Sequence, residues 1–455
     1  MSASPSHNAS RDRPAGSWSR IREGLLLTLA ALAVLSFYAW RARPGLPPDT
    51  ERGLYLAQAL RTGQWADAIN YHYPPLFPAV IVIASLIFPS LESAARAAGL
   101  ICVGLAVAPL YLLAFTVFGR RTAVLAAGFF IFRFLSELPV CRAEQMLLPL
   151  LPLALLAGLR ALEKKSSRWS LATGAIFGAA FLAKPEAWAY FLLYAAIALA
   201  AAARAPNPDR GAAPSSASRL RQLAGAIFPL LAGYFLVAGP YLLQYHHDTG
   251  RFSINPKAKT LFLIHNVYYW DDELYRVKKD ENGYFTLAQR IYIEGDKKPL
   301  ETSILELIRS PDGIFLPEYA LRLAQSLGDI IAPWYLQRIA PWVWPALLAA
   351  GLWPPAGRER RSRAYYLHLF ALLPVLTVPL FSARYPRFYF SMVPWFMIVL
   401  ARGADRLLAV SEEKMRDGRG GRLKRWTRPG LLLLLALEYY NRQLLQLNSK
   451  KIRLL

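Results

Sequence analysis

Long, nearly unbroken apolar runs dominate this chain and restrict what it can fold into. At about 1.5 Å of helix per residue, a run of some 20 residues crosses the roughly 30 Å hydrocarbon core of a bilayer. A helix of a soluble protein instead repeats its apolar residues with the helical period. The runs therefore predict an all-α polytopic membrane protein. They include residues 24–40, 97–118, 146–159, 187–203 and 223–243.

The loops between these runs alternate in charge. Six basic loops hold 25 Lys and Arg residues, whereas the short loops between them hold 8. Because basic loops stay in the cytoplasm during insertion, the alternation predicts a multi-pass plasma (bacterial inner) membrane protein with a cytoplasmic N-terminus. The basic loops are 1–23, 119–121, 163–169, 204–222, 357–363 and 403–428, and the short loops between them are 41–75, 136–145, 183–187 and 382–388.

The basic loops on the cytoplasmic side also explain the formal net charge of +23. In a soluble chain this charge would suggest a nucleic-acid partner. Here most of the excess lies in loops that face anionic lipid. We therefore expect the lipid bilayer as a partner, and no nucleic acid.

The runs predict about ten or eleven transmembrane helices. Segment 76–89 is apolar but too short to cross well, and a crossing there would turn every later basic loop outward. We expect it to lie along the membrane surface as a juxtamembrane helix. The expected spans are 24–40, 94–118, 122–138, 145–162, 170–183, 187–203, 223–245, 338–355, 364–381 and 388–402.

Five sections follow from these spans. They are a basic cytoplasmic tail (1–23), an N-terminal transmembrane catalytic module (24–245) that includes outer loop 41–93, a large outer loop (246–337), C-terminal transmembrane helices (338–402) and a basic cytoplasmic loop with a short apolar tail (403–455).

The first outer loop carries two acidic residues, Asp49 and Glu51, just beyond the first span. A carboxylate in this place is suited to act as a general base toward a hydroxyl at the membrane interface. Alternatively, Asp49 or Thr50 is the N-cap of a short amphipathic helix over 51–62. The two interpretations are compatible, because the helix N-terminus would also orient the carboxylate.

The same loop resembles a known family. Asp49, the helix around Tyr55-Leu56-Ala57 and the later Tyr73-Pro74-Pro75-Leu76 look like the first outer loop of polyprenyl-phosphate-sugar-dependent integral-membrane glycosyltransferases of the GT-C fold. This group includes protein O-mannosyltransferases and lipid A aminoarabinose transferases. The resemblance implies a GT-C-like bundle with juxtamembrane helices in the first outer loop and one large outer loop. It also implies that Asp49, or else Glu51, is the catalytic base.

Further motifs extend the resemblance over about residues 24–405. Arg142-Ala143-Glu144-Gln145 looks like the family's second acidic position, which faces the sugar-phosphate directly or through a metal ion. Ala183-Lys184-Pro185-Glu186 resembles an Arg/Lys-Pro-Glu motif whose cation binds the lipid phosphate, with Lys keeping the charge but not the bidentate geometry of Arg. Arg384-Tyr385-Pro386-Arg387 looks like the family's entry to a late span. With His72 beside the Pro-Pro turn, the expected substrate-binding set is Glu144, Arg142, Lys184, Glu186, His72, Lys257, Arg384 and Arg387.

Each assignment has a structural alternative. Glu144 could form an interfacial salt bridge with Arg142, and Lys184 could snorkel from a helix end. Lys257 could lie on a solvated loop face, and Arg387 could anchor the chain in the headgroups. The three adjacent acids of Asp271-Asp272-Glu273 do not share a face on any regular element, so we expect no metal there.

The expected reaction is transfer of a single hexosyl or pentosyl group from a polyprenyl-phosphate donor to a hydroxyl acceptor (protein, lipid or glycan) at the outer face. Polyprenyl phosphate leaves as a stable anion, so the general acid of glycoside hydrolases is not needed. The family mechanism implies inversion. We expect no required cofactor, with a divalent metal held by Glu144 and Asp49 as an open alternative. The alternative function is a transporter or flippase of a lipid-linked sugar, which needs ionisable or broken-helix positions at mid-membrane.

Overall fold

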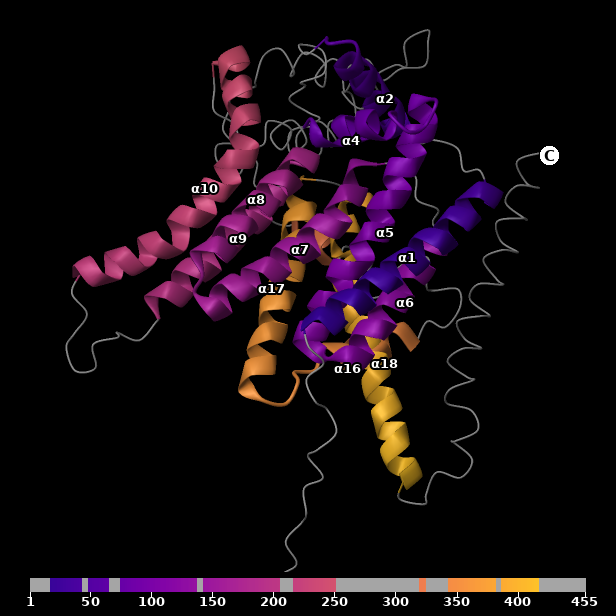
Figure 1. Cartoon of the computed structure of the whole chain (residues 1–455). Helices are drawn as coiled ribbons and strands as arrows, with labels where there is room; N and C mark the ends of the chain where they lie inside the picture. Colours follow the sequence, from indigo (N-terminus) through magenta and orange to yellow (C-terminus); the bar gives the residue numbers. More distant parts are fainter. Residues whose placement is uncertain are drawn as a thin grey trace, which may run out of the picture.

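The computed structural model describes residues 17–42, 48–64, 74–136, 142–204, 216–250, 319–324, 343–381 and 386–416, and the regular structure of these ranges is helical. Figure 1 shows them as a bundle of long helices with two short helices at its top. The elements are α1 (Ser17–Ala42), α2 (Pro48–Arg61), α4 (Leu76–Ala84), α5 (Leu91–Phe118), α6 (Arg120–Ser136), α7 (Ala143–Lys164), α8 (Ser167–Ala183), α9 (Ala187–Ala203), α10 (Ser216–Thr249), α16 (Val343–Leu352), α17 (Arg358–Phe381), the 3-10 helix η2 (Pro386–Met392) and α18 (Val393–Arg416).

Each span expected from the sequence coincides with a helix or overlaps one. By length and composition, four helices are suited to cross a membrane, and α9 is a shorter apolar helix. The all-α membrane fold predicted from the apolar runs is confirmed. The four segments are Trp18–Arg41, Leu91–Phe118, Ala143–Lys164 and Leu220–Asp248.

The two short helices of the first outer loop are α2 and α4. The expected helix over 51–62 is present, but it begins earlier, at Pro48. Proline suits the first turn, where no backbone donor is needed. Asp49 and Thr50 therefore both lie inside the first turn of α2, and the interpretation of either residue as the N-cap is wrong. With nine residues, α4 is only about 14 Å long, too short to cross, as expected of a juxtamembrane helix.

These two helices are fixed to each other and to the bundle. Gly53 of α2 leaves room for the ring of Phe77 of α4, which an added Cβ would strike. Leu56 and Ala57 are fully buried on α2. In turn, α4 packs against α5 and α8. Through α4, the acidic first turn of α2 is held at the end of the bundle where α5 begins and α8 ends.

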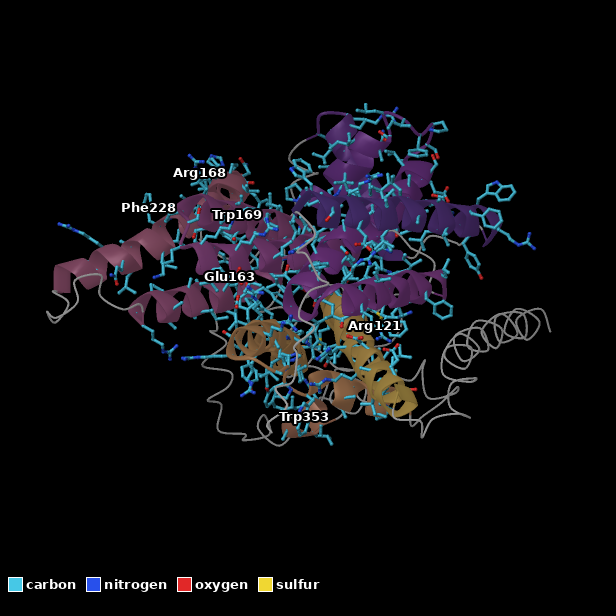
Figure 2. All side chains as sticks on the ribbon, turned by 60° about the horizontal axis from the view of Figure 1, so that its bottom comes forward. Arg121, Glu163, Arg168, Trp169, Phe228 and Trp353 are labelled. Carbon is cyan, nitrogen blue, oxygen red and sulfur yellow. The ribbon has the colours of Figure 1, made fainter. Side chains whose placement is uncertain are left out.

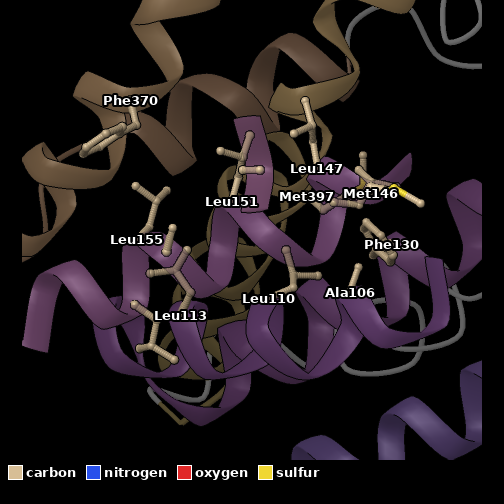
Figure 3. Close-up of a cluster of buried hydrophobic side chains, with 14 of the residues drawn as sticks. Ala106, Leu110, Leu113, Phe130, Met146, Leu147, Leu151, Leu155, Phe370 and Met397 are labelled. Carbon is tan, nitrogen blue, oxygen red and sulfur yellow. The ribbon is translucent and has the colours of Figure 1, made fainter. Parts of the chain in front are cut away.

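Helix α5 lies at the centre of the bundle and packs against α1, α4, α6 and α7. Figure 3 shows apolar side chains of α5 and α7 facing one another, with Phe130, Phe370 and Met397 closing the cluster. Lipid is as apolar as these side chains, so membrane helices associate mainly through close packing rather than through exclusion of water. The labelled residues of α5 and α7 are Ala106, Leu110, Leu113, Met146, Leu147, Leu151 and Leu155.

Glycines allow two helix pairs to approach backbone to backbone. A Cβ added at Gly174 of α8 or at Gly233 of α10 would overlap the facing helix's carbonyl oxygen, that of Leu230 or Leu171. Gly351 of α16 and Gly403 of α18 show the same relation. Small residues at helix contacts are the usual means of close approach in membranes. They set the distances between these helices.

The basic loops of the sequence meet at one end of the bundle. Arg120, at the start of α6, lies 2.8 Å from Glu23 near the start of α1. Arg121 forms ion pairs with Asp405 at 3.2 Å and Glu412 at 2.9 Å, both on α18. These contacts join the start of α6 to the start of α1 and to the C-terminal half of α18.

A second group of contacts closes the same end. Arg363 of α17 lies 2.7 Å from Glu163, near the end of α7, and donates to the carbonyl oxygen of Thr116 in α5 at 3.2 Å. Arg406 of α18 donates to the carbonyl oxygens of Ala350 and Pro354, both at 3.0 Å, around the end of α16. Figure 2 shows Arg121 and Glu163 on this end. The helix ends that the charge pattern assigns to one side of the membrane are thus together.

The glycine contacts give a stability prediction. Gly233→Ala should lower the free energy of unfolding by about 1–3 kcal/mol, because the methyl group cannot fit against α8 without a backbone shift. Gly225→Ala, on the same helix but with open space around its Cβ position, is the matched control and should be neutral or slightly stabilising. Thermal unfolding of the two variants in detergent measures the difference, and equal transition temperatures would contradict the packing described for α8 and α10.

Candidate active site

Three charged side chains meet at the opposite end of the bundle. Nζ of Lys184 lies 3.0 Å from Oε1 of Glu144 and 3.6 Å from Oε1 of Glu186. The side chains of Lys184 and Glu144 are each only 14% exposed, whereas that of Glu186 is 39% exposed. Lys184 therefore does not snorkel to the surface, and the cross-helix ion pair of Glu144 is with Lys184 rather than with Arg142.

Helix ends explain why these charges lie here. Glu144 is in the first turn of α7, and Lys184 follows the last turn of α8. An acid at a helix N-terminus and a cation at a C-terminus are both favoured by the backbone dipoles. Lys184 is extended, with φ −155° and ψ 123°, as expected before Pro185. Glu186 then occupies the N-cap position of α9, where its side chain makes no capping hydrogen bond.

Gln145 fixes the entry to α7. Arg142 precedes the helix in an extended conformation, and its backbone N–H donates to Oε1 of Gln145 at 3.2 Å. Gln145 is buried. Sequence reasoning did not assign a role to Gln145, although its spacing of three residues from the helix cap is typical of a capping residue.

The cluster carries unsatisfied polar atoms. Oε2 of Glu186 and Nε of Arg142 are buried without a hydrogen-bond partner within the described part of the chain. Buried polar atoms normally form hydrogen bonds, so an atom without a partner indicates a place where a ligand can bind. One ammonium between two carboxylates also leaves the trio of Glu144, Lys184 and Glu186 with a formal charge of −1.

The structure describes only some of the expected site residues. It brings together Glu144, Lys184 and Glu186, with Arg142 two residues from Glu144. Asp49 and Glu51 lie in α2, and Arg387 lies in η2, but their side chains are outside the described part. His72, Lys257 and Arg384 lie outside the described residues altogether, as do Asp271-Asp272-Glu273 and most of the large outer loop.

Metal binding has limited support in the described residues. No group of three or more His, Cys, Asp or Glu gathers within them. Glu144 and Glu186 supply two carboxylates, but Lys184 lies between them. An ion held by Glu144 and Asp49 needs the side chain of Asp49, which lies outside the described part, so the metal site stays a prediction.

Helix η2 approaches the cluster through a contact that the sequence did not reveal. The hydroxyl of Tyr190 donates to Oγ of Ser391 at 2.9 Å and so joins α9 to η2. Tyr190 is four residues after Glu186, on the same face of α9. A narrow pocket beside this bond is lined by Leu151 and Leu155 of α7 and by Phe370 of α17. In the sequence, the spacing of four residues between Glu186 and Tyr190 could have identified Tyr190 as a neighbour of the site.

The helical membrane bundle of the described residues is similar in fold to GT-C membrane glycosyltransferases. Residues 72–209, which include Glu144, Lys184 and Glu186, match the family model described as dolichyl-phosphate-mannose-protein mannosyltransferase. No curated protein sequence matches the chain.

Two of the solved structures that are similar to this chain illustrate the likeness. One is ArnT from Cupriavidus metallidurans, solved with undecaprenyl phosphate bound, with a TM-score of 0.50 and 17% sequence identity over 84% of this chain and 60% of ArnT. The other is the archaeal oligosaccharyltransferase AglB from Archaeoglobus fulgidus, solved with an inhibitory peptide and a dolichol-phosphate. It has a TM-score of 0.47 and 16% identity over 94% of this chain and 56% of AglB. The chain thus spans about three fifths of the length of ArnT, and the likeness to ArnT shows the fold.

The ion pair between α7 and α8 can be measured by a double-mutant cycle. We expect Glu144→Gln and Lys184→Met to couple by about 1–3 kcal/mol in unfolding free energy, because the two charges are shielded from water. The exposed pair of Glu92 and Arg96, 2.7 Å apart within α5, is the control and should couple by less than about 0.5 kcal/mol. Equal coupling in the two pairs would contradict the burial described for Glu144 and Lys184.

Proposed function

We propose that this chain is a glycosyltransferase that moves a single hexosyl or pentosyl group from a polyprenyl-phosphate carrier to a hydroxyl acceptor at the outer face of the membrane. The observation that carries the proposal is the convergence of Glu144, Lys184 and Glu186 at the ends of three helices. The charge pattern assigns these ends to the outer face. The acceptor is a hydroxyl of a protein, a lipid or a glycan.

The chemistry needs one base and a place for a departing anion. Asp49, or else Glu51, takes the proton of the acceptor hydroxyl as its oxygen attacks the anomeric carbon. The bond from that carbon to the phosphate oxygen breaks, and polyprenyl phosphate leaves with the bonding electrons. Attack opposite the leaving group inverts the anomeric centre. Positive charge beside the phosphate, at a partly dehydrated interface, is worth several kcal/mol in such a step.

Lys184 supplies that positive charge in the proposal, with Arg142 and Arg387 as further phosphate partners. The formal charge of −1 on the trio disfavours an anionic ligand. The two carboxylates have a second use, however, because sugar hydroxyls are donors that carboxylates accept from. Lys184 then faces the phosphate while Glu144 and Glu186 bind the sugar, which also gives the unpaired oxygen of Glu186 a partner.

A divalent ion fits this site only in part. Carboxylates are suitable ligands for Mg²⁺ or Mn²⁺, and Glu144 with Asp49 would hold the ion. Its chemistry there would be to neutralise charge on the leaving phosphate. Because Lys184 already occupies Oε1 of Glu144, we propose a reaction that does not require the ion.

The alternative of a transporter or flippase has less support. The ion pairs of the described residues lie at the two ends of the bundle, where an interfacial enzyme needs them. His368, in the middle of α17, accepts a hydrogen bond from Trp395 at 3.1 Å and is fixed within the packing. A transporter would instead place its ionisable groups on a pathway at mid-membrane.

The function is tested with purified protein in vesicles and a labelled polyprenyl-phosphate sugar. Asp49→Asn should lower the rate of transfer by about 10²–10⁴-fold, the usual contribution of a general base. The rate of transfer by Glu51→Gln shows whether Asp49 or Glu51 is the general base. The control is Glu92→Gln, because Glu92 is an acid at the start of α5 whose partner is Arg96.

Three outcomes would decide the matter. Loss of transfer in Asp49→Asn or Glu51→Gln, with full transfer in Glu92→Gln and equal protein levels, supports the enzyme. Transfer that persists in both variants would overturn the assignment of the base to this loop. Movement of the labelled lipid across the vesicle membrane without any transfer would favour the flippase.

A further inference from the structure

The hydrogen bond between Tyr190 and Ser391 links the two parts of the proposed phosphate site. Tyr190 is on α9, one turn after Glu186, and Ser391 is on η2, four residues after Arg387. In a 3-10 helix, four residues correspond to about 8 Å. A shift of η2 at Ser391 therefore moves Arg387 relative to Lys184 and Glu186.

The contacts of η2 show what holds it in place. Its Phe390 meets Phe134 of α6 edge to face, with ring centroids 5.7 Å apart. Met392 is buried in a small cluster with Ala371 and Val375 of α17. The burial of Met392 is not directional, and the edge-to-face contact of Phe390 orients η2 only on the side of α6. The Tyr190 hydroxyl adds a directional contact on the side that faces α9.

A pocket lies beside η2, so the hydrogen bond between Tyr190 and Ser391 contributes more to holding this segment in place. Ser391 and Met392 line the pocket together with Leu151, Leu155 and Phe370, so part of the surface of η2 lacks closely packed neighbours. The ring of Tyr190 is itself well fixed. It is only 6% exposed and lies parallel to Phe370, with centroids 6.4 Å apart and 5° between the planes. A rigid hydroxyl thus meets a segment with free space beside it.

We propose that Tyr190 is a positioning residue that, through Ser391, fixes η2 so that Arg387 can reach the donor phosphate. The inference rests on the proposed function, in which Arg387 is a phosphate partner. Tyr190 itself does not contact the phosphate. It ties the 3-10 helix that carries one phosphate-binding cation to the helix that begins at Glu186, and so sets the spacing between the two sides of the site.

The inference can be tested by removing one hydroxyl. Tyr190→Phe keeps the ring and its contact with Phe370 but removes the hydrogen bond to Ser391. The matched control is Tyr194→Phe, one turn further along the same helix, which removes a hydrogen bond of 3.1 Å to the carbonyl oxygen of Gly158. Two quantities are measured in detergent: the affinity for polyprenyl phosphate and the hydrogen exchange of the backbone amides of residues 386–392.

We expect Tyr190→Phe to speed amide exchange in η2 and to weaken polyprenyl-phosphate binding about 5-fold, in line with the loss of one neutral hydrogen bond. Ser391→Ala should have the same effect, and Tyr194→Phe should have neither. In the background of Arg387→Gln, Tyr190→Phe should cause no further loss of affinity, because both changes then act on the same phosphate contact.

The failures are distinguishable. If exchange in residues 386–392 is unchanged in Tyr190→Phe, or if Tyr194→Phe has the same effect on it, the positioning role is overturned and the proposed function is untouched. If Tyr190→Phe and Arg387→Gln lower the affinity additively, Tyr190 does not act through Arg387. If exchange rises as expected but Arg387→Gln leaves the affinity unchanged, the phosphate role of Arg387 in the proposed function is overturned.

Discussion

The separation of charge between the two ends of the bundle is the constraint on which the rest of the structure depends. At one end, arginines at the starts of α6 and α17 pair with acids of α1, α7 and α18. At the other, Lys184 pairs with Glu144 and Glu186. Charged groups are costly inside hydrocarbon. Each membrane-crossing helix therefore carries its charged residues near its ends, outside the hydrocarbon core. The helix ends then bring together residues that are far apart in the sequence.

Close packing complements this constraint. Glycines let α8 approach α10 and let α16 approach α18, and α5 fills the centre. Closely packed helices in lipid cannot easily slide along one another. The ends of α7, α8 and α9 therefore stay at the same level along the bundle axis. The ammonium of Lys184 can then lie within 3.0 Å of a carboxylate 40 residues earlier in the chain. The same register places Tyr190 against η2.

Much of the fold was predictable from the sequence. The apolar runs predicted the helices, and charge alternation predicted which ends would meet. The start of α2 was misplaced because Pro48 is compatible with a first turn, which a search for a capping side chain does not detect. For the site, the sequence predicted a set of residues, of which the described structure brings Glu144, Lys184 and Glu186 together. Its members came from family-like motifs, but the pairing of Lys184 with Glu144 depends on the packing of α7 against α8, which no local pattern encodes. The bond between Tyr190 and Ser391 was missed for the same reason, since it joins residues 201 positions apart.

The central claim is that Glu186 lies on the outer side of the membrane and the basic loop around Arg360 on the cytoplasmic side. Single cysteines test it most directly, as Glu186→Cys and Arg360→Cys in a chain whose Cys102 and Cys141 are replaced by Ser. Both sites are solvent-accessible in the folded protein. With a membrane-impermeant thiol reagent, position 186 should react in intact cells and position 360 only after permeabilisation. Reaction of both positions from the same side, or the reverse order, would contradict the account.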